Sequence, residues 1–335
     1  MKRIILHVGT EKTGTTSIQK YFWDNREKYR ERGLCYPECL GTQNHVGLVT
    51  CARGFAENDS IRILQEIYSR STHERYKRRA RLQFRREIEN FDTIVLSNEH
   101  LSARLRKPEE FKRLKSFLDV EANDVKVVLY VRRQDEFLIS SYTAHILAGS
   151  TAPFSIPGVD RGHMRYNYRL LLDRWAEAFG IGNLTVRKYQ KASFPDGSVV
   201  KDFCKTVGID SLGQQADYNE NTSLDANKLE FLRRLNKFLP LISEGRRGFD
   251  RTKLLSLIRE IELVGPELSS DAEGIVEFQR RFEGSNRYVA NKYFGRIEPE
   301  GDPLFGASRK RAQKSGRQWD EETAFEIFAA LWNRS

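Results

Sequence analysis

The sequence predicts an α/β fold in which a parallel sheet is flanked by helices and followed by a helical C-terminal region. Three observations favour this fold. Short apolar runs alternate with longer helical segments, the apolar runs are continuous rather than alternating, and strand signals vanish beyond residue 220. A continuous apolar strand is buried on both faces, as in a parallel sheet covered by helices.

The expected elements follow in chain order. Four strands are predicted from runs of β-branched and other apolar residues, at 3–8 (RIILHV), 93–97 (TIVLS), 126–131 (KVVLYV) and 183–187 (NLTVR). Helices are predicted at 15–31, 61–90 with a possible break, 109–119, 134–148, 166–179 and 198–207. Further helices are predicted at 224–238, 251–263, 271–282, 285–293 and 320–333, with a loop or extended arm at 295–318. We expect residues 1–215 to form the α/β core and residues 216–335 a mostly helical part of the same domain, as a lid or recognition region.

Composition and charge indicate a globular protein with an anionic partner. The 335 residues are 39% hydrophobic and 30% charged, and the formal net charge is +10. Much of the excess lies in RSTHERYKRRARLQFRRE at 70–87, which reads as a solvated helix face or as a docking surface for an acidic substrate. Nucleic-acid binding is not predicted, because the run lacks a recognition module and interleaved aromatic residues.

The chain carries neither a membrane-spanning pattern nor a metal-binding pattern. Its apolar runs are far shorter than the ~20 residues that a membrane helix needs, and the apolar stretch after Lys2 and Arg3 is too short for a signal peptide, so we expect a cytoplasmic protein. The four cysteines are Cys35, Cys39, Cys51 and Cys204. Cys35 and Cys39 lie close together, but no second Cys or His pair at metal-ligand spacing accompanies them, so no metal is expected.

The loop after the first strand, GTEKTGTTS, resembles a phosphate loop with a displaced lysine. Gly9 and Gly14 have the Walker spacing, but Thr15 stands where an ATPase has lysine, and Lys12 lies inside the loop. Glycines let backbone N–H groups approach an anion, and the hydroxyls and amides that open the next helix lie at its positive end. The residues expected to hold phosphate groups are Gly9, Thr10, Lys12, Thr13, Gly14, Thr15, Thr16 and Ser17.

A second anion-binding pair is expected after the strand VVLYV. Arg132 follows that strand, and Ser140 lies about two helical turns further on. Both can face one anion above the carboxyl edge of the sheet, which is where open α/β folds bind ligands. An arginine offers a bidentate fork that suits a phosphate monoester.

These two motifs together resemble those of the sulfotransferases that use 3'-phosphoadenosine 5'-phosphosulfate (PAPS). GTEKTGTTSIQKYF is similar to the 5'-phosphosulfate motif of that family, and VVLYVRRQDEFLISSY to its 3'-phosphate motif. SNEHL at 97–101 and SNRYVANKYFG at 285–295 are similar to segments of bacterial, carbohydrate-type members. The resemblance implies a PAPS-binding core, adenosine 3',5'-bisphosphate as product, and a carbohydrate or glycolipid acceptor that is sulfated on a hydroxyl or amine. It also implies that Lys12 contacts the transferring sulfuryl group and that no Mg²⁺ is required.

The acceptor must lose a proton as it attacks, which calls for a base. Glu99 is the first choice because it follows the strand TIVLS at the expected ligand edge, and His100 and His45 are rivals, since the family uses either Glu or His. The resemblance also makes Tyr166, Arg187, Ser285 and Asn286 candidates for closing over the nucleotide. Arg161, His163 and Arg165 either line an acceptor cleft or belong to a solvated loop.

Two other functions remain open on sequence grounds. A P-loop kinase or NTPase with a modified Walker loop is one, although TIVLS ends in Ser97-Asn98 and provides no obvious Walker B carboxylate. The other is a polyanion-binding protein without a nucleotide, acting through residues 70–87.

Overall fold

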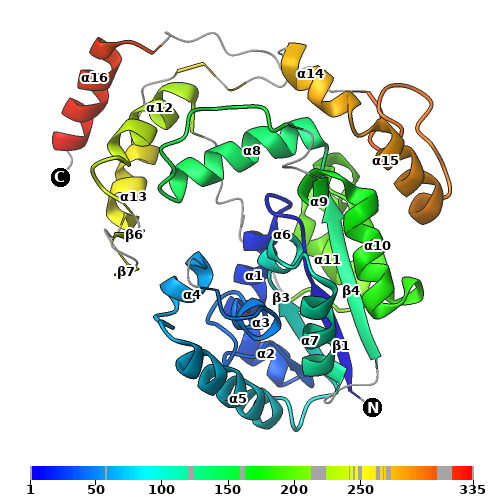
Figure 1. Cartoon of the computed structure of the whole chain (residues 1–335). Helices are drawn as coiled ribbons and strands as arrows, with labels where there is room; N and C mark the ends of the chain where they lie inside the picture. Colours follow the sequence, from blue (N-terminus) through cyan, green and yellow to red (C-terminus); the bar gives the residue numbers. More distant parts are fainter. Residues whose placement is uncertain are drawn as a thin grey trace.

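A five-stranded parallel sheet forms the centre of the computed structural model, with strand order β2-β3-β1-β4-β5 (Figure 1). The strands are β1 (Arg3–His7), β2 (Leu34–Cys35), β3 (Thr93–Ser97), β4 (Asp124–Val131) and β5 (Leu184–Lys188). The structure describes residues 2–56, 59–119, 124–158, 163–212, 224–240, 242–243, 246–247, 251–261, 265–266, 268, 273–307 and 319–333. The predicted fold class and the four predicted strands are confirmed. The fifth strand, β2, was not predicted because two residues are too short to form a pattern.

Helices cover both faces of the sheet, which explains why its strands are apolar throughout. On one face Ile5, Val95 and Val128 pack in a core with residues of α1 (Thr15–Asp24), α2 (Arg26–Arg30) and α11 (Val199–Val207). On the other face the strands pack against helices whose buried side chains form the larger core, namely α3 (Gly47–Ala52), α5 (Arg70–Glu87), α7 (Pro108–Asp119) and α10 (Tyr168–Phe179).

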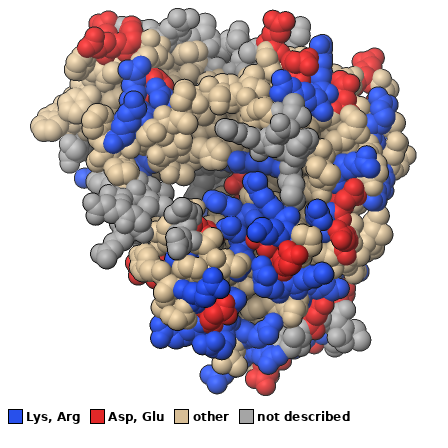
Figure 2. Space-filling model, in the orientation of Figure 1, with Lys and Arg blue, Asp and Glu red and all other residues tan. Residues whose placement is uncertain are grey.

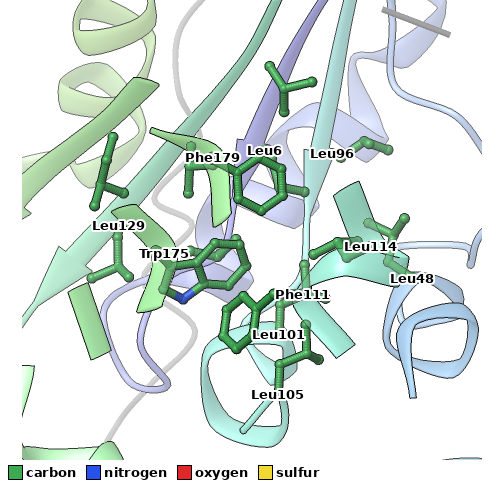
Figure 3. Close-up of a cluster of buried hydrophobic side chains, with 14 of the residues drawn as sticks. Leu6, Leu48, Leu96, Leu101, Leu105, Phe111, Leu114, Leu129, Trp175 and Phe179 are labelled. Atoms are coloured by element: carbon green, nitrogen blue, oxygen red, sulfur yellow. The ribbon is translucent and has the colours of Figure 1, made fainter. Parts of the chain in front are cut away.

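The larger core is organised around Trp175 of α10, which is fully buried (Figure 3). Its ring lies 5.0 Å from the ring of Phe111 in an edge-to-face arrangement and 5.6 Å from the stacked ring of Phe179. Leu6 and Leu129 of the sheet belong to the same cluster. The close packing of these aromatic rings against the strands fixes α7 and α10 on the sheet and so fixes the loops at its carboxyl edge.

Several predicted helices are shorter than expected. The predicted helix 15–31 is interrupted at Asn25 between α1 and α2. The predicted helix 61–90 is divided into α4 (Ser60–Leu64) and α5, and a capping box formed by Ser69 and Thr72 starts α5. The short helices α3 and α6 (His100–Arg104) were not predicted, because five or six residues show no clear period.

The predicted helix 166–179 is α10, which begins at Tyr168 because the Asn167 side chain caps it by accepting a hydrogen bond from the Leu170 amide; the short helix α9 (His163–Tyr166) precedes it. Short 3₁₀ turns follow α10 and β5, namely η1 (Ile181–Asn183), η2 (Lys191–Ser193) and η3 (Pro195–Gly197). The turn η1 links α10 to β5, and η2 and η3 link β5, the last strand of the sheet, to α11.

Helix α8 (Gln134–Leu147) and the C-terminal helices form an arch beyond the carboxyl edge of the sheet (Figure 1). The arch contains α12 (Ala226–Leu235), α13 (Thr252–Glu260), α14 (Glu273–Arg280), α15 (Glu283–Val289), the π-helical turn η4 (Ala290–Phe294) and α16 (Glu321–Trp332). A hollow opens between the arch and the sheet, and Lys and Arg side chains gather beside it (Figure 2). Among the described residues, no helix is long and apolar enough to span a bilayer.

Two features of the C-terminal part differ from the sequence-based prediction. The strands β6 (Ile242–Ser243) and β7 (Arg246–Arg247) form a small antiparallel pair in a region where no strand was expected. Of the predicted arm at 295–318, the part up to residue 307 contains a turn closed by paired hydrogen bonds between Asp302 and Gly306. Residues 308–318 lie outside the described residues.

Candidate active site

The loop between β1 and α1 has the backbone of a tight anion cradle. Gly9, Lys12 and Gly14 have φ angles of 44°, 66° and 77°. A Cβ atom at Gly9 would lie 2.5 Å from Thr15 Cγ2, and one at Gly14 would lie 2.8 Å from Val199 Cγ1. Both glycines are therefore needed for conformation and for close packing, as the phosphate-loop interpretation requires.

Two threonines of the loop build its shape. The Thr10 amide and hydroxyl donate to the Tyr130 carbonyl of β4 at 3.2 and 3.0 Å. The Thr13 hydroxyl donates to the Thr10 carbonyl at 2.6 Å. These hydroxyls are buried and engaged, so the side chains of Thr10 and Thr13 shape the loop and have no donor left for a ligand.

Helix α1 begins at this loop without a side-chain cap. Gly14 occupies the N-cap position in the left-handed region, and no side chain there accepts a helix amide. The positive end of the helix therefore faces the loop, where an anion would be stabilised by backbone N–H groups. Thr15 is buried under the loop, Thr16 is exposed and Ser17 is partly exposed at this end of α1.

Lys12 is partly buried, and four charged groups influence the pKa of its side chain. Burial lowers the pKa of its ammonium group, and the positive charge of Arg132 lowers the pKa further. Glu11 and Glu99 act in the opposite direction, and Arg259 of α13 again lowers the pKa. The C-terminal arch therefore contributes positive charge to the surroundings of the loop, as no sequence pattern had indicated.

Arg132 is fixed directly beside Lys12. Its Nη1 donates to the Lys12 carbonyl at 3.0 Å, and its Nε donates to Glu136 Oε2 at 3.0 Å. Its guanidinium group also lies 5.5 Å from the centre of the Tyr189 ring. Ser140 is partly exposed on α8, and within the described part of the chain its hydroxyl has no hydrogen-bond partner. Arg132 thus reaches the loop, while Ser140 remains available for a ligand.

Glu99 lies under the loop where β3 ends. Its Oε2 accepts a hydrogen bond from Gln19 Nε2 of α1 at 2.7 Å, and its Cβ would lie 3.6 Å from a Cβ at Gly9. His100 is adjacent, with its Nδ1 3.9 Å from Oε1 of Glu11. The structure therefore brings Glu99 and His100 to the loop that carries Lys12.

His45 has a different role from the one proposed on sequence grounds. It is fully buried, its Nδ1 accepts from the Ser97 amide at 2.8 Å, and its Nε2 is 2.8 Å from the Pro37 carbonyl. Burial lowers the pKa of His45 to about 4. With both ring nitrogens bonded to the backbone, His45 has no site for an acceptor proton, and we do not retain it as a base.

Arg187 is engaged in a structural ion pair. It contacts the carboxylate of Asp202 with two nitrogens, and Tyr130 donates to the same carboxylate at 2.7 Å. Asp202 is buried, so Arg187 serves to compensate its charge. Because Nε and Nη2 of Arg187 donate to Asp202, the nucleotide contact expected from the resemblance gains no support.

The remaining candidates from the later segments join helices together. Tyr166 is buried between Phe137 and Phe278, with ring-centre distances of 5.2 and 5.1 Å. Ser285 accepts from the Arg169 amide at 3.0 Å, and Asn286 is buried and donates to Gln134 and Asp302. Each has a packing or capping function, so a role in closing over a nucleotide gains no support. Arg161 and the side chain of His163 lie outside the described residues.

His7 is a site residue that the sequence analysis missed. It is fully buried, and its Nδ1 lies 2.8 Å from Ser97 Oγ, while its Nε2 has no partner in the described structure and would lie 3.6 Å from a Cβ at Gly9. Burial lowers the pKa of His7 to about 3. A polar residue that ends an apolar strand directly before the loop was the available signal.

The described residues hold no group of three His, Cys, Asp or Glu side chains that could bind a metal ion. The four cysteines are free thiols, and Cys35, Cys51 and Cys204 are buried. Burial is the main reason that the pKa of the Cys35 thiol is raised to about 12, so this thiol stays protonated.

Comparisons with known proteins give distant similarities. No protein-family model matches the chain. An uncharacterized protein of Archaeoglobus fulgidus is 29% identical over 208 residues, which cover 60% of this chain and 54% of that protein, so the chain spans about half the length of that relative.

Two solved structures are similar at 13% sequence identity. The sulfotransferase from Alicyclobacillus acidocaldarius has a TM-score of 0.39 and matches over 67% of this chain and 87% of its own. The sulfotransferase domain of the Synechococcus PCC 7002 olefin synthase has a TM-score of 0.34 and matches over 84% and 96%.

Proposed function

We propose that the protein is a PAPS-dependent sulfotransferase that sulfates a hydroxyl or amine of a carbohydrate-containing acceptor. The observation that carries this proposal is the position of Lys12. It lies inside the loop beside Arg132, while the Walker lysine position is held by the buried Thr15. A loop with this arrangement presents a cation to the group beyond the first phosphate without the lysine that bridges the phosphates of ATP.

The residues present fit an anionic nucleotide donor. The loop has two glycines that tolerate no Cβ, a helix start without a side-chain cap, and the cations Lys12 and Arg132. Ser140 adds a hydroxyl with no partner in the described structure. When bound, PAPS supplies an activated sulfuryl group on a phosphate leaving group. The loop amides and Lys12 would bind the phosphosulfate, and Arg132 together with Ser140 would bind the 3'-phosphate.

In this proposal Lys12 acts on the leaving group and Glu99 acts on the acceptor. Lys12, held near the loop mouth, stabilises the negative charge that develops on the leaving group. Glu99 takes the proton of the acceptor hydroxyl or amine, because its carboxylate lies at the same loop and is oriented by Gln19. His100 is a second candidate for that proton, since it lies beside Glu11 at the same edge.

The C-terminal helices have a role in acceptor recognition in this proposal. Arg259 influences Lys12 from α13, so the arch borders the place where the acceptor would approach. A carbohydrate offers hydroxyl groups at that position, and the cations beside the hollow suit an acceptor that also carries negative charge (Figure 2).

Radiolabelled PAPS and a panel of neutral and acidic oligosaccharides test this function. We expect label transfer to at least one acceptor in the presence of EDTA. Glu99→Gln should lower the transfer rate by about 100-fold while leaving the affinity for adenosine 3',5'-bisphosphate within a few-fold of wild type. Glu109→Gln, on the first turn of α7, is the matched control. Transfer that depends on Mg²⁺, or transfer from ATP instead of PAPS, would exclude the proposal.

A further inference from the structure

Glu11, the residue before Lys12, is held by an arginine from another part of the chain. Arg165 of α9 donates through Nη2 to the Glu11 carboxylate and to Ser141 Oγ, the latter at 3.3 Å. Its Nη1 lies 3.3 Å from His145 Nε2, and its guanidinium group lies 5.3 Å from the centre of the Phe137 ring. Ser141, His145 and Phe137 are all on α8, so Arg165 ties the loop to that helix.

The contact between Arg165 and His145 requires a neutral imidazole. An arginine can only donate, so His145 must accept through Nε2 and be neutral. Burial lowers the pKa of His145, and the charge of Arg165 lowers it further. Near neutral pH the imidazole therefore accepts from Arg165 rather than repelling it.

The tip of the loop is thus held from two sides. Arg132 binds the carbonyl of Lys12 at 3.0 Å, and Arg165 binds the side chain of Glu11. Lys12 has a φ of 66°, a left-handed conformation that carries an energetic cost for a non-glycine residue. External contacts must offset that cost if the loop is to keep its shape without a ligand.

Both arginines are themselves anchored to α8. Arg132 precedes the helix and binds Glu136 at 3.0 Å, and Arg165 contacts the more C-terminal positions 137, 141 and 145. Ser140 lies between these anchor points. The two arginines therefore set the separation between the loop, which would bind the phosphosulfate, and the hydroxyl that would bind the 3'-phosphate.

The negative charge of Glu11 would disfavour the binding of an anion at the loop, and Arg165 compensates that charge. A carboxylate in an anion-binding loop would repel a negatively charged donor, and it is close enough to Lys12 to affect its pKa. The ion pair with Arg165 compensates this charge. An uncompensated charge in a partly buried position is more harmful than the loss of the whole pair.

We propose that Glu11 and Arg165 form a latch that fixes the loop tip against α8, so that Arg165 is a positioning residue for Lys12. The latch rests on the proposed donor site for its function but exists without any ligand. Arg165 holds the loop in its binding conformation and cancels the charge of Glu11.

A double-mutant cycle with Arg165→Met, Glu11→Gln and the combined variant tests the latch, with adenosine 3',5'-bisphosphate as the calorimetric probe. Arg165→Met should weaken binding by at least 10-fold, because it leaves Glu11 uncompensated. The double variant should bind adenosine 3',5'-bisphosphate at least 3-fold more tightly than Arg165→Met does. Arg174→Met, which breaks an exposed ion pair with Glu177 on α10, should leave binding unchanged. A double variant that binds no better than Arg165→Met would overturn the proposal.

Hydrogen exchange without ligand separates the latch from the donor assignment. The amides of Thr10 and Ile18 are bonded to Tyr130 and Gly14, so they report opening of the loop. We expect both to exchange at least 3-fold faster in Arg165→Met than in wild type, with a smaller change in Arg165→Lys. Unchanged exchange would refute the latch even if nucleotide binding fell. Faster exchange in a protein that does not bind adenosine 3',5'-bisphosphate would support the latch and refute the donor assignment.

Discussion

Lys12 is the residue on which the proposed chemistry depends most. Its pKa is lowered by burial and by Arg132, and both carboxylates near it favour its charged form. A partly buried ammonium group at the loop can stabilise developing charge with little reorganisation.

Lys12→Ala should therefore lower the rate of sulfuryl transfer by at least about 100-fold, with a smaller loss in affinity for adenosine 3',5'-bisphosphate. Single-turnover transfer and calorimetry measure the two effects. Lys20→Ala, elsewhere on α1 and paired with Asp24, should have wild-type kinetics. Equal transfer rates in Lys12→Ala and wild type would show that Lys12 does not contact the transferring group.

Arg187 is a residue to which we assign a role in stability, and this role can be tested by substitution. Arg187→Ala leaves the buried Asp202 carboxylate with Tyr130 alone, and we expect a loss of about 3 kcal/mol in the free energy of unfolding. Urea denaturation measures this loss. Affinity for adenosine 3',5'-bisphosphate should be unchanged below the unfolding transition, and a large loss of affinity in a stable variant would return Arg187 to the donor site.

At the scale of elements, the loop and α11 fit together through Gly14. Gly14 and Gly33 both have a φ of 77°, but a Cβ at Gly14 would meet Val199 of α11 at 2.8 Å, while one at Gly33 would meet nothing within 4 Å. Gly33→Ala should cost only the conformational penalty of about 1 kcal/mol.

Gly14→Ala should therefore cost more stability than Gly33→Ala and should weaken nucleotide binding at least 10-fold, because the loop must move away from α11. Thermal denaturation and calorimetry on the two variants measure both effects. If the two variants were equally stable and both bound the nucleotide normally, close packing of the loop would not matter.

The end of β3 is held by two buried histidines. His45 bonds the Ser97 backbone with its ring and its amide, and His7 contacts the Ser97 hydroxyl, two residues before Glu99. The pKa values of His45 and His7 are lowered to about 4 and about 3. Since the unfolded chain binds these protons near pH 6.5, it holds more protons than the folded chain as the pH falls below that value.

Stability should therefore be fully present above pH 6.5 and decrease as the pH falls towards 4. We expect a loss of roughly 2 kcal/mol between pH 7 and 5.5 from the two histidines together. Urea denaturation at both pH values measures the loss. An unchanged or higher free energy of unfolding at pH 5.5 would contradict the assignment of neutral, buried imidazoles.

At the scale of the whole molecule, the sequence predicted what depends on local pattern. The apolar strands, the glycine spacing of the loop and the location of Glu99 at a strand end are local features, and the structure contains each of them. The burial of His45 and the ion pair of Arg187 with Asp202 depend on contacts across the fold, so residue type alone suggested a different role.

The contacts that the sequence did not predict join distant segments. Arg165 contacts Glu11, 154 positions away in the sequence, and the charge of Arg259 in the C-terminal arch lowers the pKa of Lys12. The helix and strand periods of the sequence do not predict interactions between such distant residues. The first pair connects the loop to α9, and the second is an electrostatic effect of the C-terminal helices on Lys12.

We expect the loop with Lys12 and the pair of Arg132 and Ser140 to bind one nucleotide with phosphates at both ends. Calorimetric titration with adenosine 3',5'-bisphosphate in EDTA tests it most directly, beside ATP with Mg²⁺ and the variants Arg132→Ala, Ser140→Ala and Thr143→Ala. We expect micromolar binding without metal, at least 10-fold weaker in Arg132→Ala, weaker in Ser140→Ala and unchanged in Thr143→Ala. No binding by wild type, or tighter binding of ATP with Mg²⁺, would contradict it.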